Sequence, residues 1–171
     1  MGYPDLEKLF SDLGKITALK MQGASQLPGN ERSVFLLEKN NEYYYLLPSP
    51  LFDDVSVGLP QLVDGLFFYA ILADHPQQVM VGPSRGNANY NWQQVVRGHA
   101  SVSLEGDVLY AGDLTFCEFK LVQWTHFSGH YLPDVELRHT QLTPNVKRLL
   151  PERLFVDPFQ AMHRRRQARF S

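Results

Sequence analysis

Two short segments of this 171-residue chain carry the side-chain types used in acid–base chemistry and in the recognition of polar ligands. Residues 97–101 read Arg-Gly-His-Ala-Ser, and residues 128–133 read Ser-Gly-His-Tyr-Leu-Pro. Imidazole changes its charge near neutral pH, and guanidinium binds anions through paired hydrogen bonds. The candidate catalytic residues are therefore His99 and His130. The candidate ligand-binding residues are Arg97, Ser101, Gly112, Ser128 and Tyr131.

A predicted three-stranded meander over residues 98–127 would bring these segments together. Its strands are expected at 98–104, 108–116 and 121–127, joined by short turns. In that register Gly112 lies on the middle strand between His99 and Thr125, and a glycine there is typical of a close approach to the backbone. Gly129 would let the chain reverse and bring His130 back over Gly112. The alternative is that both histidines are satisfied inside a packed core and that Ser-Gly-His-Tyr is a tight turn.

The rest of the chain predicts a single α+β domain at 1–158, with an antiparallel sheet, helices at the N- and C-termini, and a basic helix or tail at 159–171. Helical spacing is present at 4–13, 134–142 and 145–150. Strand patterns predict a hairpin of 33–38 with 43–47, a buried strand at 66–72 and a returning strand at 79–81.

Composition restricts the classes of protein to which the chain can belong. Hydrophobic residues make up 44% of the chain, which is ordinary for a globular domain. The lone Cys117 excludes an internal disulfide and a thiolate zinc site, and it suits a reducing compartment. No stretch approaches the roughly 20 apolar residues of a membrane helix, and the N-terminus has no signal-peptide pattern. We therefore expect a cytoplasmic protein with no membrane contact, no metal site and no cofactor.

The tail at 159–171 contains four arginines and no acidic residue, although the whole chain has a net charge of −2. A basic amphipathic helix of this kind can contact nucleic acid or an acidic partner, or it can be a solvated surface. Its spacing also resembles a calmodulin-binding IQ motif, with Arg165 where glycine is usual. That resemblance implies a calmodulin-like partner bound by Gln160, Arg164, Arg165 and Arg169.

A wider resemblance covers residues 66–150. Residues 97–101, then 108–114 (Val-Leu-Tyr-Ala-Gly-Asp-Leu) and then 128–133 resemble a module of the plant IQ-motif calmodulin-binding protein family. They are also similar to segments of some bacterial effector-like and toxin-like proteins. The pattern there is His-Ser-Ser, then Ala-Gly-Glu or Ala-Gly-Arg, then Ser-Gly-His-Tyr-x-Pro. This chain departs from it at Ala100 and Asp113, and its IQ-like segment follows the module instead of preceding it. The resemblance implies an effector- or toxin-related domain that acts in the cytoplasm or is delivered into a host or target cell. It implies no particular activity.

Three functions therefore stay open. The first is a small binding module in which Arg97 and the two histidines hold a polar or anionic ligand or a peptide. The second is a metal-independent ribonuclease-like toxin with His99 and His130 as general base and general acid. The third is an enzyme acting on NAD or another nucleotide. The net charge of −2 disfavours the ribonuclease, because nucleic-acid binding depends on basic surface.

Overall fold

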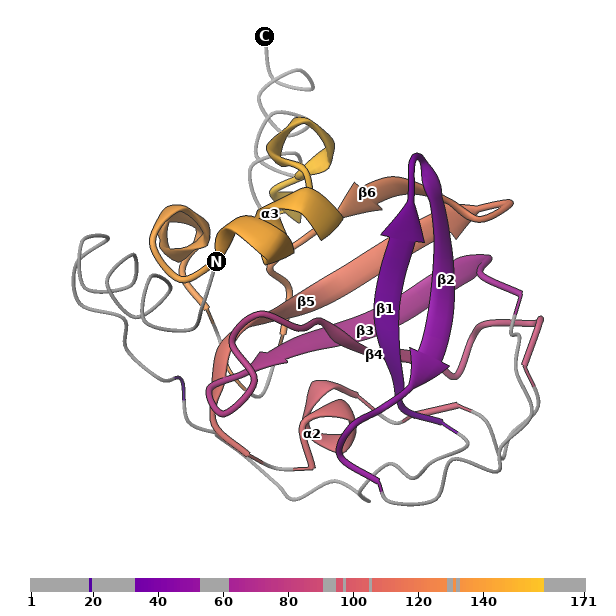
Figure 1. Ribbon diagram of the computed structural model, residues 1–171, viewed down its shortest axis with the longest axis horizontal. Coiled ribbons are helices and arrows are strands. Elements are labelled where there is room, and N and C mark those ends of the chain that lie inside the picture. The colour runs from indigo at the N-terminus through magenta and orange to yellow at the C-terminus, as the bar shows by residue number, and fades with distance from the viewer. Residues whose placement is uncertain are drawn as a thin grey trace, which may run out of the picture.

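A six-stranded antiparallel sheet forms the centre of the computed structural model, in the order β2-β1-β4-β3-β5-β6 (Figure 1). The structure describes residues 19, 33–52, 62–90, 95–96, 98–104, 106–128, 131 and 133–158. The strands are β1 Phe35–Asn40, β2 Tyr43–Pro48, β3 Gly65–Leu72, β4 Met80–Pro83, β5 Val108–Cys117 and β6 Lys120–Trp124. The described helices are short: α2 His99–Val102, α3 Pro144–Leu149, and the 3-10 turns η1 Val135–His139 and η2 Glu152–Leu154.

The predicted strands form where apolar or aromatic runs are separated by turn residues. The hairpin of β1 and β2 is confirmed, and it turns at Asn41, whose φ of 56° asparagine tolerates well. The buried strand β3 and its antiparallel return β4 are also confirmed. So are the second and third strands of the meander, which pair as β5 and β6.

Both faces of the sheet are covered, and β3 shows this most clearly. Its side chains alternate, as they must in a strand: Phe67, Tyr69 and Ile71 belong to one core cluster, whereas Ala70 and Leu72 belong to another. We call the first the inner face, which is packed against α3. The second is the outer face, which is packed against α2. Figure 1 shows α3 and α2 on opposite sides of the sheet.

The sheet curls until its two end hairpins meet. The backbone N–H of Tyr44 in β2 donates to the carbonyl of Phe119, 2.7 Å away in the β5–β6 turn. The N–H of Phe119 donates in turn to Val63, just before β3, at 2.9 Å. These bonds connect the first strand of the sheet order to the last hairpin, so the fold is a half-barrel closed at one end.

The expected α+β class with helices at both termini is wrong, because the described chain is mostly antiparallel β with short helical segments. The predicted strand at 98–104 is also wrong: residues 99–102 form α2, and the edge of β5 expected for it is occupied by β3. The apolar run of β3 pairs with β5 from Val108 to Phe116, and most of its side chains are buried, which stabilises this pairing. The predicted helix at 134–142 is the 3-10 turn η1, whereas the one at 145–150 is confirmed as α3.

Two predicted segments, the helix at 4–13 and the basic tail at 159–171, lie outside the described residues. Within the described residues, no helix has the length and apolar character needed to cross a membrane.

Candidate functional site

Helix α2 places His99 on the outer face of the sheet, against β3 and β5. The residue is 5% exposed, and its ring packs on Phe68 with 4.8 Å between the ring centroids. Its Nε2 atom lies 2.7 Å from the carbonyl oxygen of Gly112. A carbonyl can only accept, so Nε2 carries the proton and donates it. This bond sets the tautomer and the orientation of the imidazole.

Asp113 is the second member of this site. It pairs across the sheet with Phe68 and therefore shares the outer face with His99. Its Oδ1 atom lies 3.4 Å from Nε2 of His99, within ion-pair range if the imidazole is protonated. The Nε2–H already donates to Gly112, however, and the buried Oδ1 accepts no hydrogen bond. A buried carboxylate oxygen without a donor is costly, and it marks a place where a ligand's donor would be stabilised.

Gly112 faces the inner side, because it pairs with Tyr69 of that face. A Cβ atom built on Gly112 would lie 1.9 Å from the carbonyl oxygen of Thr125. The sequence predicted that Gly112 and Thr125 lie close together, and they do. The group that approaches the bare backbone is the protein's own chain after β6.

Thr125 connects the two faces through its hydrogen bonds. Its N–H donates to the carbonyl of Asp113 at 2.9 Å. Its side-chain Oγ1 accepts from the backbone N–H of Asp113 and from that of Phe127, each at 3.2 Å. The Tyr69 hydroxyl donates to its carbonyl at 2.7 Å, and complete burial raises the pKa of Tyr69 and keeps this donor neutral. Asp113 and Phe127 are thereby held side by side.

Tyr131 belongs to the outer-face core, and Ser128 is buried as well. The Ser128 hydroxyl accepts from the backbone N–H of Tyr131 at 3.4 Å. The Tyr131 hydroxyl donates to Gly106 at 2.6 Å and lies 2.5 Å from the hydroxyl of Ser103. Both side chains are buried, so they connect the segment after β6 to the end of α2.

Several predicted site residues cannot be compared with the structure. Arg97 and His130 lie outside the described residues, and so do Gln160, Arg164, Arg165 and Arg169 of the tail. Ser101 is placed in α2 only by its backbone. The convergence of His99 and His130 therefore stays a prediction.

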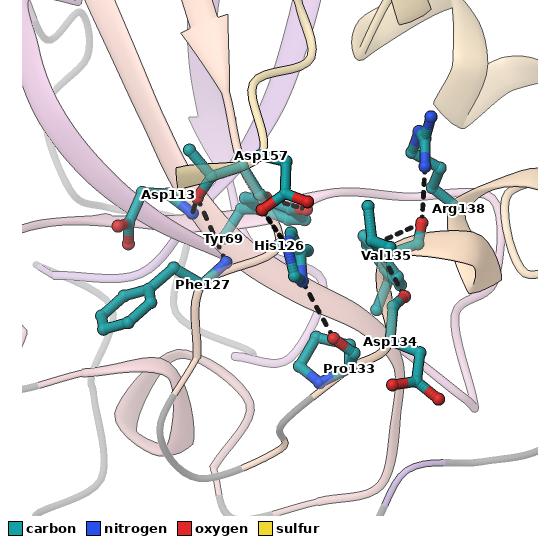
Figure 2. A network of polar contacts seen from close by, with 11 residues as sticks. Tyr69, Asp113, His126, Phe127, Pro133, Asp134, Val135, Arg138 and Asp157 are labelled. Carbon is teal, nitrogen blue, oxygen red and sulfur yellow. Dashed lines mark hydrogen bonds and ion pairs between the residues drawn. The ribbon is translucent and has the colours of Figure 1, made fainter. Parts of the chain in front are cut away.

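A second histidine–aspartate pair, which sequence reasoning missed, lies near the ends of β6 and η2 (Figure 2). His126 is buried, with Nδ1 2.9 Å from the carbonyl of Pro133 and Nε2 3.4 Å from Oδ1 of Asp157. Its ring packs on Phe155 at 5.8 Å between centroids. No spacing in the sequence indicates a pair formed by residues 31 positions apart.

The residues around His126 are closely packed and are joined by hydrogen bonds. The Arg138 guanidinium lies 4.3 Å from the centre of the Phe155 ring and donates to the carbonyl of Val135 at 2.7 Å (Figure 2). Its hydrogen bonds to Glu152 raise the pKa of Arg138 further. This arrangement fastens the C-terminal turns to the sheet. Among the described residues, no group of three or more His, Cys, Asp or Glu side chains is arranged to hold a metal ion.

Comparison of the chain with models of protein families, with curated proteins and with solved structures finds no match. The candidate site is consequently interpreted from its own geometry, and its centre is the Asp113 carboxylate beside His99.

Proposed function

We propose that this chain is a small binding domain that recognises a cationic side chain, such as arginine or lysine in a peptide, at the Asp113 carboxylate. The observation that carries the proposal is the buried Oδ1 of Asp113, which accepts no hydrogen bond in the described structure. The Asp113 side chain as a whole is 21% exposed, so a ligand can reach the carboxylate, although Oδ1 itself is buried. A guanidinium or ammonium group would supply the missing donor together with the opposite charge.

Phe127 provides a second contact for the same ligand. Its side chain is 50% exposed, which is unusual for phenylalanine, and its backbone N–H shares the acceptor Thr125 Oγ1 with that of Asp113. Figure 2 shows both side chains extending to the same side, away from His126 and Asp157. A cation between a carboxylate and an aromatic face gains both an ion pair and a cation–π contact.

His99 supports this site and is poorly placed to react with a ligand. It is buried, one ring face is covered by Phe68, and its Nε2 proton is used by Gly112. A catalytic base has to come within hydrogen-bond distance of its substrate. The position of His99 instead favours a role in holding β5 in place through its hydrogen bond to Gly112.

The test is a titration of the 15N-labelled protein with N-acetyl-arginine amide, followed by NMR, with N-acetyl-citrulline amide as the uncharged comparison. The amide signals of Asp113 and Phe127 should shift with the arginine compound and not with the citrulline compound. Asp113→Asn should weaken binding about tenfold or more, since it removes the charge at the ion pair. Asp107→Asn, at an exposed aspartate of the turn before β5, is the matched control and should bind normally. Unchanged signals at Asp113 and Phe127 even at ~50 mM ligand would end the proposal.

One observation favours catalysis as a second candidate, against the burial of His99 described above. Since Nε2 of His99 holds the proton, the basic nitrogen of the neutral ring is Nδ1, which has no partner among the described residues. A general base in a metal-independent ribonuclease would use such a nitrogen. Single-stranded RNA incubated at neutral pH with chelator should then be cleaved by the wild type and left intact by His99→Gln. Intact RNA with the wild type removes this candidate.

We also propose that the protein is related to effector-like and toxin-like proteins and that it is located in the cytoplasm. What supports both is the resemblance of residues 97–101, 108–114 and 128–133, together with the single cysteine.

A further inference from the structure

A surface hollow lies at the closed end of the half-barrel, and Asp113 is not among its lining residues. It has a volume of about 190 Å³ and lies between the tip of the β1–β2 hairpin, the start of β6 and the turn η2. The lining residues that matter for its chemistry are Lys39, Glu42, Tyr44, Lys120, Arg153 and Leu154. We call this hollow the basic groove.

The charges of the basic groove are unbalanced. Three cationic side chains line it, against the single carboxylate of Glu42. Glu42 pairs with Lys120 at 3.6 Å, but both side chains are more than half exposed, so solvent weakens this pair. Arg153 has no ion-pair partner within the described part of the chain. The groove therefore keeps an excess of positive charge that an anion would neutralise.

The lowered pKa of Lys39 reflects the same excess of positive charge. Its pKa is lowered by partial burial first, and then by repulsion from Arg148 and Arg153. Arg148 is already engaged, since it pairs with Glu38 and donates to the backbone carbonyl of Lys39. Like charges held close together in a partly buried hollow cost free energy, and a bound anion recovers it.

The groove is also preorganised. Lys39 extends over the ring of Tyr44 at 5.4 Å, and Lys120 extends over the ring of Tyr43 at 5.3 Å. The Tyr44 hydroxyl donates inward to the carbonyl of Leu149 at 2.6 Å, and its backbone N–H is bound to Phe119. The aromatic rings thus restrain the ammonium groups, which reduces the entropy lost when they bind a ligand.

We propose that the basic groove binds a small phosphorylated anion through Lys39, Lys120 and Arg153. The guanidinium of Arg153 offers paired donors to phosphate oxygens, and the two ammonium groups supply point charges. The hollow, of about 190 Å³, is large enough to admit a small anion such as a diphosphate. A phosphate fits better than a carboxylate because it carries more charge and more acceptor oxygens.

The test is isothermal titration calorimetry of the full chain with sodium pyrophosphate at low ionic strength. Binding should be measurable, and it should weaken as salt is added, because the contributing charges are near the surface. Arg153→Gln and Lys39→Met should each weaken binding about tenfold or more. Lys147→Gln, at an exposed lysine of α3 outside the groove, removes the same charge and should bind within about twofold of wild type.

Two outcomes would overturn the proposal. One is the absence of binding heat with pyrophosphate. The other is an equal loss of affinity in Lys147→Gln and in the groove variants, which would show attraction to overall charge only. Arg153 is exposed and makes no hydrogen bond within the described residues, so Arg153→Gln should fold normally, and circular dichroism checks this.

Discussion

The carbonyl oxygen of Thr125 occupies the space in which a side chain at Gly112 would begin, 1.9 Å from where a Cβ atom would lie. This contact lets the chain cross the inner face directly after β6. The crossing places the hydroxyl of Thr125 where it holds the backbone of both Asp113 and Phe127. The shape of the proposed site therefore depends on a residue that carries no side chain.

Replacing Gly112 with alanine should destabilise the protein by about 3 kcal/mol or more, because the obstructing atoms are backbone and cannot move aside without breaking hydrogen bonds. Urea denaturation followed by circular dichroism measures the loss. Gly86→Ala is the matched control, since a Cβ atom there would meet nothing within 4 Å, and its free energy of unfolding should not fall. Equal stability of Gly112→Ala and wild type would contradict the observed contact.

Tyr69→Phe should lower the free energy of unfolding by about 1–2 kcal/mol, because it removes the donor to Thr125 and leaves that buried carbonyl unpaired. Tyr45→Phe is the control: Tyr45 is exposed, and its hydroxyl has no hydrogen-bond partner within the described structure. If both variants lose the same stability, the bond from Tyr69 to Thr125 contributes nothing specific. Chemical denaturation of the two variants side by side decides this.

The sheet strands were predictable from the sequence, because each is an apolar or aromatic run bounded by turn residues. The hairpin turns at Asn41 and after Cys117 follow directly from that local pattern. The partner of β5 was not predictable in this way. Strand pairing between β3 and β5 joins residues that are 36 to 51 positions apart, and local sequence does not indicate which run will fill an edge.

Helix α2 was missed because its four residues are too few to show a helical period, and Val102 favours a strand. The closeness of His99 to Gly112 was nevertheless expected, although through a strand pairing that does not exist. The real contact is a hydrogen bond from the imidazole to the Gly112 carbonyl, made across the outer face from α2. The orphaned oxygen of Asp113 and the pairing of His126 with Asp157 depend on three-dimensional packing that sequence patterns do not encode.

Stability should fall at alkaline pH because several tyrosines are buried. Burial raises the pKa of Tyr44 to about 12 from its ordinary value of 10. Because the pKa of Tyr44 is higher in the folded than in the unfolded chain, its neutral hydroxyl contributes fully to stability below pH 10. This contribution to the free energy of unfolding is lost as the pH rises toward 12. Burial raises the pKa of Tyr69 and Tyr110 in the same direction.

Urea midpoints measured between about pH 9 and pH 12 should therefore decrease steadily. Tyr44→Phe should be less stable than wild type at neutral pH, since it loses the bond to Leu149, but its midpoint should fall less steeply above pH 10. Parallel curves for the two proteins would show that the Tyr44 hydroxyl has the same pKa in the folded and unfolded chains.

A substitution in the β5–β6 turn should stabilise the protein. Glu118 and Phe119 both adopt positive φ angles, of 48° and 70°, which suit asparagine and glycine better. The turn keeps this conformation because its backbone is hydrogen-bonded to residues outside the turn. The N–H of Glu118 donates to Asp64, and the backbone of Phe119 bonds to Val63 and Tyr44. Glu118→Asn preserves these backbone bonds and relieves the left-handed strain, so it should raise the free energy of unfolding by roughly 0.5–1 kcal/mol. Glu118→Gln loses the same charge without relieving the strain and should leave stability unchanged. A gain in both variants would instead point to the charge of Glu118 as the destabilising feature.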